Sequence, residues 1–403
     1  MKIVADPNIP FVREAFAPLG DAQFVHGRQI TAATVRDAEL LLVRSITPVN
    51  ATLLNGSKLK FVATATIGTD HVDEVCLRER GIGFASAVGS NANSVAEYVV
   101  AAMLELARRS AGGFRLRDKT LGVVGVGNVG SRVVRYAEAL GMRVLQNDPP
   151  RQRQEMAGAD RMAGHADGAY SQSWNHTQPT TFVSLNRVCA EADIITVHVP
   201  LTKSGPDATF HLFDAKRVAG LTRRPILINS ARGAVVDTEA LLEAIAAKKL
   251  GGVVLDVWEG EPDIRTDLLG LVDLGTPHIA GYSFDGKVNG TQMIHRTVCG
   301  FFGIKLTWEP VLPPSPVPSC DCGIGAGEDD EDVLWRVIRQ IYDITADDAA
   351  LRKGVSAPGG IGASFDKLRA EYPVRREFFN TKLTLRGASE SLRQKFAALG
   401  FRL

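Results

Sequence analysis

The stretch 119–148, KTLGVVGVGNVGSRVVRYAEALGMRVLQND, constrains the fold of this chain most, because a glycine motif stands there inside a βαβ pattern. Residues 121–126 form a short apolar run typical of a buried parallel strand, and apolar residues then return at helical spacing. Between the two patterns lies G-x-G-x-x-G, formed by Gly125, Gly127 and Gly130. Such glycines allow a tight turn, the close approach of a pyrophosphate and close packing of a helix on a strand. The stretch therefore predicts a phosphate site at the N-terminus of a helix.

A second predicted strand, 143–146, indicates the cofactor. It leads to Asp148, which lies 18 residues after Gly130. A carboxylate at this point can accept hydrogen bonds from the adenosine ribose hydroxyls, which favours NAD. Arg151 and Arg153 keep NADP open as an alternative, because a nearby arginine can bind a 2′-phosphate.

With 403 residues, the chain is too long for one ordinary core and fits two or three domains. Strand and helix patterns alternate over residues 1–90, which predicts a small α/β substrate-binding domain, completed by about 281–305. Residues 91–280 are predicted to form a Rossmann-type, doubly wound parallel sheet domain. After a proline-rich linker, residues 306–403 are predicted to form a small C-terminal α+β domain.

The patterns of three shorter stretches predict further elements of the structure. The segment NSVAEYVVAAMLELARRS, from Asn93, predicts a helix that crosses between the first two domains. Apolar runs at 194–199, 226–229 and 253–257, separated by helical patterns at 208–219 and 238–249, predict one parallel sheet. The polar stretch 149–181 has little apolar periodicity and is predicted to be an inserted surface loop.

Composition excludes several classes of partner. The 46 lysines and arginines are balanced by 45 aspartates and glutamates, and no long basic block stands out, so we expect no nucleic-acid partner. The N-terminal residues become polar at Asp6, and no run of about 18 apolar residues follows. We therefore expect no membrane partner and a cytoplasmic location. The five scattered cysteines indicate reduced thiols, and we predict no metal site.

Three residues that follow predicted strands can carry redox chemistry on a 2-hydroxy acid. Such a reaction needs a cation for the carboxylate and an acid/base for the hydroxyl proton, roles that Arg232 and His278 can fill. Glu261 can pair with His278 and orient its ring. Taken singly, each residue has an ordinary structural explanation as an ion pair, a turn residue or a hydrogen-bonded histidine. Their joint placement after neighbouring strands favours catalysis.

The segments GVGNVG, NSARGAVVD, VLDVWEGEP and PHIAG resemble, in this order and spacing, the D-isomer-specific 2-hydroxyacid dehydrogenases. The resemblance spans roughly residues 40–300 and implies a flavodoxin-like substrate domain, NAD as cofactor, and Arg232, Glu261 and His278 as the catalytic set. Together with the glycine motif, it predicts cofactor contacts from Gly125, Gly127, Asn128, Val129, Gly130, Asp148, Val199, Ser230, Ala231, Arg232, Asp256 and Gly281. It implies substrate contacts from Ser45, Thr66 and Tyr282. Arg44 and Lys287 adjoin these loops and are candidates for a phosphate contact.

A narrower resemblance extends through the C-terminal tail. LLVRSIT, TATIGTDHVDE, HIAGYSFDGKVNGT and FDKLRAEYPVRREF are similar to one branch of the family, which belongs to the vitamin B6 pathway. This branch implies a small-molecule phosphorylated 2-hydroxy acid as substrate and a homodimer formed through the C-terminal domain. Two alternatives stay open: a D-3-phosphoglycerate dehydrogenase or hydroxypyruvate/glyoxylate reductase with the same catalytic set, and a non-enzymatic, NAD-sensing protein of corepressor type.

Overall fold

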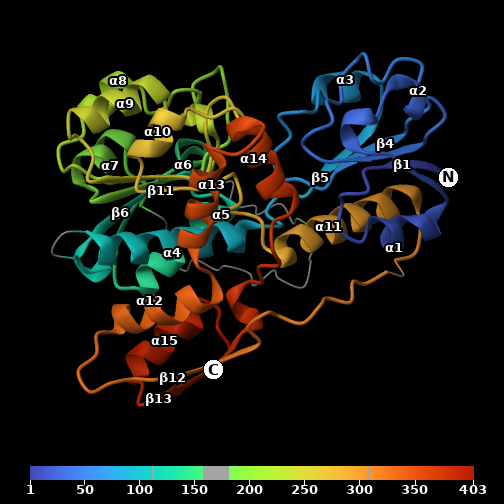
Figure 1. Ribbon diagram of the computed structural model, residues 1–403. Helices are drawn as coiled ribbons and strands as arrows, with labels where there is room; N and C mark the ends of the chain where they lie inside the picture. Colours follow the sequence, from blue (N-terminus) through green and yellow to red (C-terminus); the bar gives the residue numbers. More distant parts are fainter. Residues whose placement is uncertain (111–112, 158–180, 307) are drawn as a thin grey trace. The chain divides into compact units, whose positions relative to one another are not determined.

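The computed structural model describes residues 1–110, 113–157, 181–306 and 308–403 (Figure 1). These residues divide into two compact units. The first unit comprises Met1–Ala92 and Tyr282–Pro314, and the second comprises Asn93–Gly281 and Ser315–Leu403.

The first unit is built on a five-stranded parallel sheet in the order β2-β1-β3-β4-β5. This is the flavodoxin-like strand order, as predicted. Its strands are β1 (Lys2–Ala5), β2 (Asp21–Phe24), β3 (Leu40–Val43), β4 (Phe61–Thr64) and β5 (Gly83–Ser86). Its helices are α1 (Val12–Phe16), η1 (Ala17–Leu19), η2 (Gly27–Gln29), α2 (Ala32–Val35), α3 (Glu74–Glu79) and α11 (Phe284–Phe302).

Alternate residues of these strands enter two separate apolar cores, because successive side chains of a strand point to opposite faces. Leu40 and Leu42 of β3 pack in one core, with Ile294 and Val298 of α11. Leu41 packs in the core on the other face. Helix α11, which comes late in the chain, thus packs in the core of the first unit.

The second unit contains a six-stranded parallel sheet in the order β11-β10-β9-β8-β6-β7. Its strands are β6 (Thr120–Val124), β7 (Arg143–Asn147), β8 (Ile194–Val197), β9 (Ile226–Asn229), β10 (Gly252–Leu255) and β11 (Leu274–Gly275). Its helices before the C-terminal segment are α4 (Ala92–Arg109), η3 (Leu116–Asp118), α5 (Asn128–Ala139), α6 (Pro149–Met156), α7 (Leu185–Glu191), α8 (Ala215–Ala219), η4 (Gly233–Val235), α9 (Thr238–Ala246) and α10 (Thr266–Leu271). The direction of strand succession reverses at β6, where open α/β sheets bind their ligands.

Two local predictions differ from the structure. The start of the predicted loop 149–181 is helix α6, because Asp148 caps it and a proline occupies its first turn. The remainder of that loop, 158–180, lies outside the described residues. The helical pattern at 208–219 yields only α8, because the Asp214 carboxylate accepts the Arg217 N–H and so caps a helix that begins at Ala215.

The C-terminal segment from Ser315 onward is grouped with the second unit, and its predicted formation of a domain of its own at 306–403 stays a prediction. Strands β12 (Ser319–Gly323) and β13 (Lys382–Arg386) form a parallel pair. The segment also contains α12 (Asp330–Ile341), α13 (Ile344–Gly354), α14 (Gly360–Ala370), η5 (Phe378–Asn380) and α15 (Glu390–Ala398). Helix α13 packs against β11, and Leu351 and Phe365 enter the same apolar core as Leu227 and Trp258. Shared burial of apolar surface joins the segment to the sheet.

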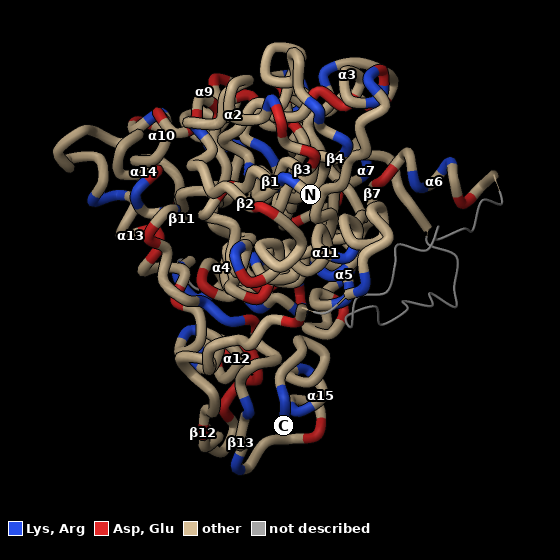
Figure 2. The backbone as a smooth tube through the Cα atoms, turned by 90° about the vertical axis from the view of Figure 1, so that its right-hand side faces the viewer, with Lys and Arg blue, Asp and Glu red and all other residues tan. Residues whose placement is uncertain are grey.

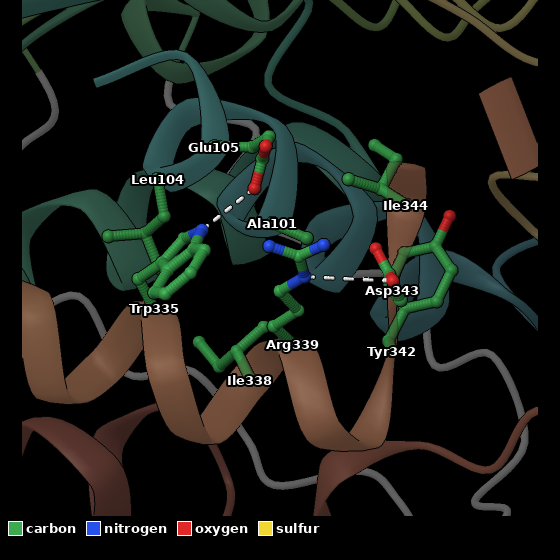
Figure 3. Close-up of a pocket in the computed structure, with 9 residues that line it drawn as sticks. All are labelled: Ala101, Leu104, Glu105, Trp335, Ile338, Arg339, Tyr342, Asp343 and Ile344. Carbon is green, nitrogen blue, oxygen red and sulfur yellow. Dashed lines mark hydrogen bonds and ion pairs between the residues drawn. The ribbon is translucent and has the colours of Figure 1, made fainter. Parts of the chain in front are cut away.

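Helices α12 and α4 pack together through a charged and aromatic contact (Figure 3). The Trp335 indole N–H donates to Glu105 Oε2 at 2.7 Å, and the Arg108 guanidinium lies 4.1 Å from the centre of the Trp335 ring. The buried Glu331 carboxylate accepts the backbone N–H groups of Leu116 and Arg117. These contacts connect the start of α12 to the residues that precede β6.

Charged residues of both signs are interspersed along the described chain (Figure 2). All five cysteines are buried free thiols. Among the described residues, no group of three or more metal-ligating side chains comes together, and no helix has the length and hydropathy needed to cross a membrane.

Candidate active site

The glycine motif forms a tight turn between β6 and α5. Gly125 has a φ of +87°, and a Cβ atom there would lie 2.7 Å from the His198 carbonyl oxygen. A Cβ atom at Gly130 would lie 2.0 Å from the Gly125 carbonyl oxygen, so α5 approaches the turn as only glycine permits. Gly127 faces open space at the N-cap of α5. The free N–H groups at the start of this helix are therefore accessible to an anion.

Asp148 lies beside this turn, at the end of β7. Its Oδ2 accepts the Val126 N–H at 2.8 Å and its Oδ1 accepts the Arg151 N–H at 3.0 Å. Each carboxylate oxygen has a second lone pair, so the group can still accept ribose hydroxyls. Arg151 donates to the Val126 carbonyl and pairs with Glu155, and Arg153 pairs with Asp207. Both arginines thus have protein partners, which favours NAD over NADP.

Residues after β8 and β9 complete the edge of the predicted cofactor site. The Val199 side chain lies against Gly125, 2.8 Å from where a Cβ would stand. His198 is neutral, because burial lowers its pKa to about 3, and its Nε2 lies 2.9 Å from Thr196 Oγ1. Ser230 Oγ is buried and has no hydrogen-bond partner among the described residues. A buried hydroxyl without a partner is costly, and a bound ligand would satisfy it.

Asn229 shapes the loop that carries Arg232. Its side-chain amide donates to the Arg232 carbonyl at 3.0 Å, and its side-chain oxygen accepts the Ala231 N–H at 3.1 Å. Gly233 packs directly on the next loop, since a Cβ there would lie 2.1 Å from the Trp258 carbonyl. This contact brings the Arg232 loop against the loop that carries Glu261.

Glu261 and His278 form the predicted pair. Their Oε2 and Nδ1 atoms are 2.7 Å apart, and Glu261 Oε1 accepts the Trp258 N–H at 2.8 Å. Burial opposes ionisation of Glu261, but the charge and hydrogen bond of His278 and the Trp258 N–H hold the pKa of Glu261 below its ordinary value. The carboxylate therefore orients the ring through Nδ1 and leaves Nε2 for substrate chemistry.

Asp256 organises the backbone of the loop that carries His278. The carboxylate is buried and accepts the Thr276 hydroxyl at 2.6 Å and the N–H groups of Ile279 and Ala280 at 2.7 and 3.0 Å. Burial raises the pKa of Asp256, while the His278 charge and these hydrogen bonds act in the opposite direction. The predicted cofactor contact of Asp256 stays a prediction, and its structural role is the support of this loop.

Sequence reasoning missed Trp258, which joins the loops that carry the predicted catalytic residues. Its indole N–H donates to the Thr276 carbonyl at 3.0 Å, its backbone N–H binds Glu261, and its carbonyl packs on Gly233. The tryptophan stands inside the segment VLDVWEGEP, but a buried aromatic residue is usually a core residue. Only its three tertiary contacts show that it links the loops of Arg232, Glu261 and His278.

The predicted substrate residues all lie in the first unit. Arg44 and Ser45 follow β3, and Thr66 follows the neighbouring β4, so they stand at the carboxyl ends of adjacent parallel strands. Thr66 Oγ1 donates to the Gly68 carbonyl at 3.1 Å. Tyr282 precedes α11, and the Lys287 ammonium lies 4.3 Å from the centre of its ring. Their contacts with substrate stay predictions.

Comparison with known proteins places this geometry in a family. Residues 87–280 match the family described as D-isomer specific 2-hydroxyacid dehydrogenase, NAD binding domain, and residues 311–400 match one described as a domain of unknown function. The chain is 47% identical over 382 residues to an erythronate-4-phosphate dehydrogenase from Salinibacter ruber, covering 94% of this chain and 92% of that protein. It is 45% identical to the Edwardsiella ictaluri enzyme of the same name, over 100% and 99% of the two chains.

A solved structure with the same fold is D-lactate dehydrogenase from Aquifex aeolicus, complexed with NAD and lactic acid. It superposes with a TM-score of 0.61 at 26% identity, and covers 75% of this chain and 96% of its own. The curated relatives thus match nearly the whole chain, whereas this structure matches three quarters of it.

Proposed function

The chain belongs to the D-isomer-specific 2-hydroxyacid dehydrogenase family, and we propose that it oxidises 4-phospho-D-erythronate at C2 to 2-oxo-3-hydroxy-4-phosphobutanoate with NAD, a step in pyridoxal 5′-phosphate biosynthesis. The near full-length identity of 44–47% to erythronate-4-phosphate dehydrogenases carries the choice of substrate. The Glu261–His278 pair at 2.7 Å supports turnover over a purely cofactor-sensing role.

The residues around the glycine motif fit NAD. The N-terminus of α5 offers N–H groups to the pyrophosphate, Asp148 offers oxygens to the ribose, and the unpartnered Ser230 hydroxyl offers a further polar contact. When bound, NAD supplies the acceptor for the hydride from C2 of the substrate.

The protein's own side chains have three roles in this proposal. Arg232 holds the substrate carboxylate and polarises the C2 oxygen. His278 Nε2 takes the C2 hydroxyl proton, because its Nδ1 is bound to Glu261. Glu261 fixes the ring and stabilises the imidazolium that forms when the proton arrives.

The first unit supplies the proposed substrate contacts. We assign contacts to Ser45, Thr66 and Tyr282, and a phosphate contact to Arg44 or Lys287, because a doubly negative phosphate needs cations besides Arg232. We also propose that the protein acts as a homodimer in the cytoplasm, assembled through its C-terminal segment.

A substrate panel tests the proposed function. Purified protein is assayed with 4-phospho-D-erythronate, D-3-phosphoglycerate, glycerate and D-lactate, each with NAD and with NADP, and kcat/KM is compared. We expect the highest value for 4-phospho-D-erythronate with NAD. A higher value for another acid would establish a different dehydrogenase, and NAD binding without turnover of any acid would favour the corepressor type.

A further inference from the structure

The catalytic histidine sits in a backbone conformation that its surroundings must maintain. His278 has a φ of +56°, in the left-handed region that residues other than glycine rarely adopt. Such a conformation persists where neighbouring contacts over-determine it. The His278 N–H donates to the Asp256 carbonyl at 2.7 Å, and the Asp256 carboxylate holds the next two N–H groups. These hydrogen bonds fix the backbone N–H groups of His278, Ile279 and Ala280.

The C-terminal segment also makes hydrogen bonds to backbone groups that precede this loop in the sequence. Asp348 Oδ1 accepts the Gly275 N–H at 2.7 Å. Arg352 pairs with Asp348 and donates to the carbonyls of Leu269 and Val272 at 2.6 and 2.8 Å. Helix α13 therefore supports the residues that lead into the catalytic loop.

Arg375 contacts the loop itself, two residues after the histidine. Its Nη2 donates to the Ala280 carbonyl at 2.5 Å, and the N–H of that same residue donates to Asp256. Arg375 is 6% exposed, and its guanidinium lies 4.3 Å from the centre of the Tyr342 ring. Asp347, whose Oδ2 accepts the hydroxyls of Tyr342 and Tyr372, provides a nearby negative charge.

Stability alone does not explain this arginine. Its Nε and Nη1 are buried and have no hydrogen-bond partner among the described residues. Burying a cation with incomplete hydrogen bonding is unfavourable, and a well-packed apolar side chain in its place is often neutral or stabilising. Within the part of the chain that the structure describes, the hydrogen bond of its side chain is to the Ala280 carbonyl in the catalytic loop.

We propose that Arg375 is a positioning residue, which holds the Ala280 carbonyl and so fixes the backbone that aims His278 at the substrate. The inference rests on the proposed hydride-transfer function. It gives the C-terminal segment a part in catalysis through the loop, in addition to any part in assembly. Arg375 acts without touching substrate or cofactor.

Hydrogen exchange and kinetics on Arg375→Met, Arg375→Lys and Arg393→Met test the proposal. Arg393 is a matched control, because its Nη2 donates to the Leu385 carbonyl at 2.6 Å within the same segment, away from the catalytic loop. Exchange is followed in the protein without added ligands, at the amides of Ile279 and Ala280. Turnover is measured with the 2-hydroxy acid that the wild-type protein oxidises fastest, so that a wrong substrate assignment leaves the test valid.

We expect faster exchange at both amides and a kcat lower by about 10² in Arg375→Met, because a displacement near 1 Å of a catalytic group can cost that much. The NAD dissociation constant should not change. Arg375→Lys should recover part of kcat, because lysine keeps a hydrogen-bond donor of the same charge. If Arg375→Met fails to fold, the comparison of Arg375→Lys with the wild type tests the proposal instead. Arg393→Met should behave as the wild type. Unchanged exchange in the Arg375 variants, or faster exchange with wild-type kcat, would overturn the proposal.

Discussion

Glu259 and Glu261 are two positions apart in the sequence and each pairs with a histidine, but the surroundings of the two pairs differ. Glu261 pairs with His278 at 2.7 Å, and Glu259 pairs with His211 at 2.8 Å. Glu259 also accepts the Thr238 N–H at the start of α9, a capping contact within the fold. Glu261 instead accepts the N–H of Trp258, the residue that joins the catalytic loops. The contrast provides an internal control for the catalytic pair.

Removing the charge of Glu261 tests whether its carboxylate orients His278 for turnover. Glu261→Gln should lower kcat by about 10² to 10⁴, the usual contribution of general acid–base catalysis, because the histidine loses the acid that orients it. Glu259→Gln, which breaks a pair of nearly the same length, should retain turnover. Steady-state kinetics at saturating substrate distinguish the two variants, and equal losses in both would contradict the assignment.

We expect Asp148 to determine the preference between the two nicotinamide cofactors. Its charge should repel a 2′-phosphate, so the wild type should use NAD with a much higher kcat/KM than NADP. Asp148→Asn should reduce the NAD:NADP ratio by about tenfold, which corresponds to ~1.4 kcal/mol. Asp267→Asn, at an exposed acid of α10 that pairs with Arg265, is the matched control. Equal use of both cofactors by the wild type would refute this role.

At the scale of elements, a buried polar cluster connects the C-terminal helices with the catalytic loop. Asp347 lies at the centre of this cluster, accepts two tyrosine hydroxyls and is close to Arg375. Burial raises its pKa to about 6, although Arg375 and the tyrosine hydroxyls act in the opposite direction. The ionised form is therefore less favourable in the folded protein than in the unfolded chain.

This shift predicts a pH dependence of stability. An aspartate in the unfolded chain has a pKa of 3.8, so between this pH and about pH 6 the folded protein binds more protons than the unfolded chain. The contribution of Asp347 to the free energy of unfolding is therefore fully present below pH 3.8. It is lost as the pH rises to about 6. Asp347→Asn removes the titration, so the wild type should lose stability relative to this variant over that range. Urea midpoints of both proteins across the range measure this, and parallel profiles would contradict the shift.

Across the whole molecule, local patterns predict some features and miss others. The glycine turn, Asp148 and the Glu261–His278 pair could be predicted, because each depends on residues near strand ends whose order fixes their placement. Helix α6 was wrongly predicted as a loop, because its start depends on a capping aspartate and a proline rather than on apolar periodicity. The roles of Trp258 and Arg375 could not be predicted, since they depend on contacts between residues far apart in sequence.

Removal of the C-terminal segment tests both assembly and catalysis. Deleting residues 306–403 should expose the apolar surface that packs on Leu351 and Phe365, which belong to the core of the six-stranded sheet. We expect aggregation or an inactive monomer, whereas the full chain should be a dimer by light scattering. A soluble truncated dimer with unchanged KM and kcat would show that neither assembly nor catalysis depends on this segment.

The fate of the C2 hydrogen shows whether the protein transfers a hydride from the substrate to NAD. 4-Phospho-D-erythronate that carries deuterium at C2 is mixed with NAD and either wild-type protein or His278→Asn, and the products are analysed by mass spectrometry. We predict that the wild type forms deuterated NADH and the 2-oxo acid in equal amounts, and that His278→Asn is slower by about 10² to 10⁴ while still binding NAD. Deuterium that stays in the acid with folded, NAD-bound wild-type protein, or normal transfer by His278→Asn, would contradict the account.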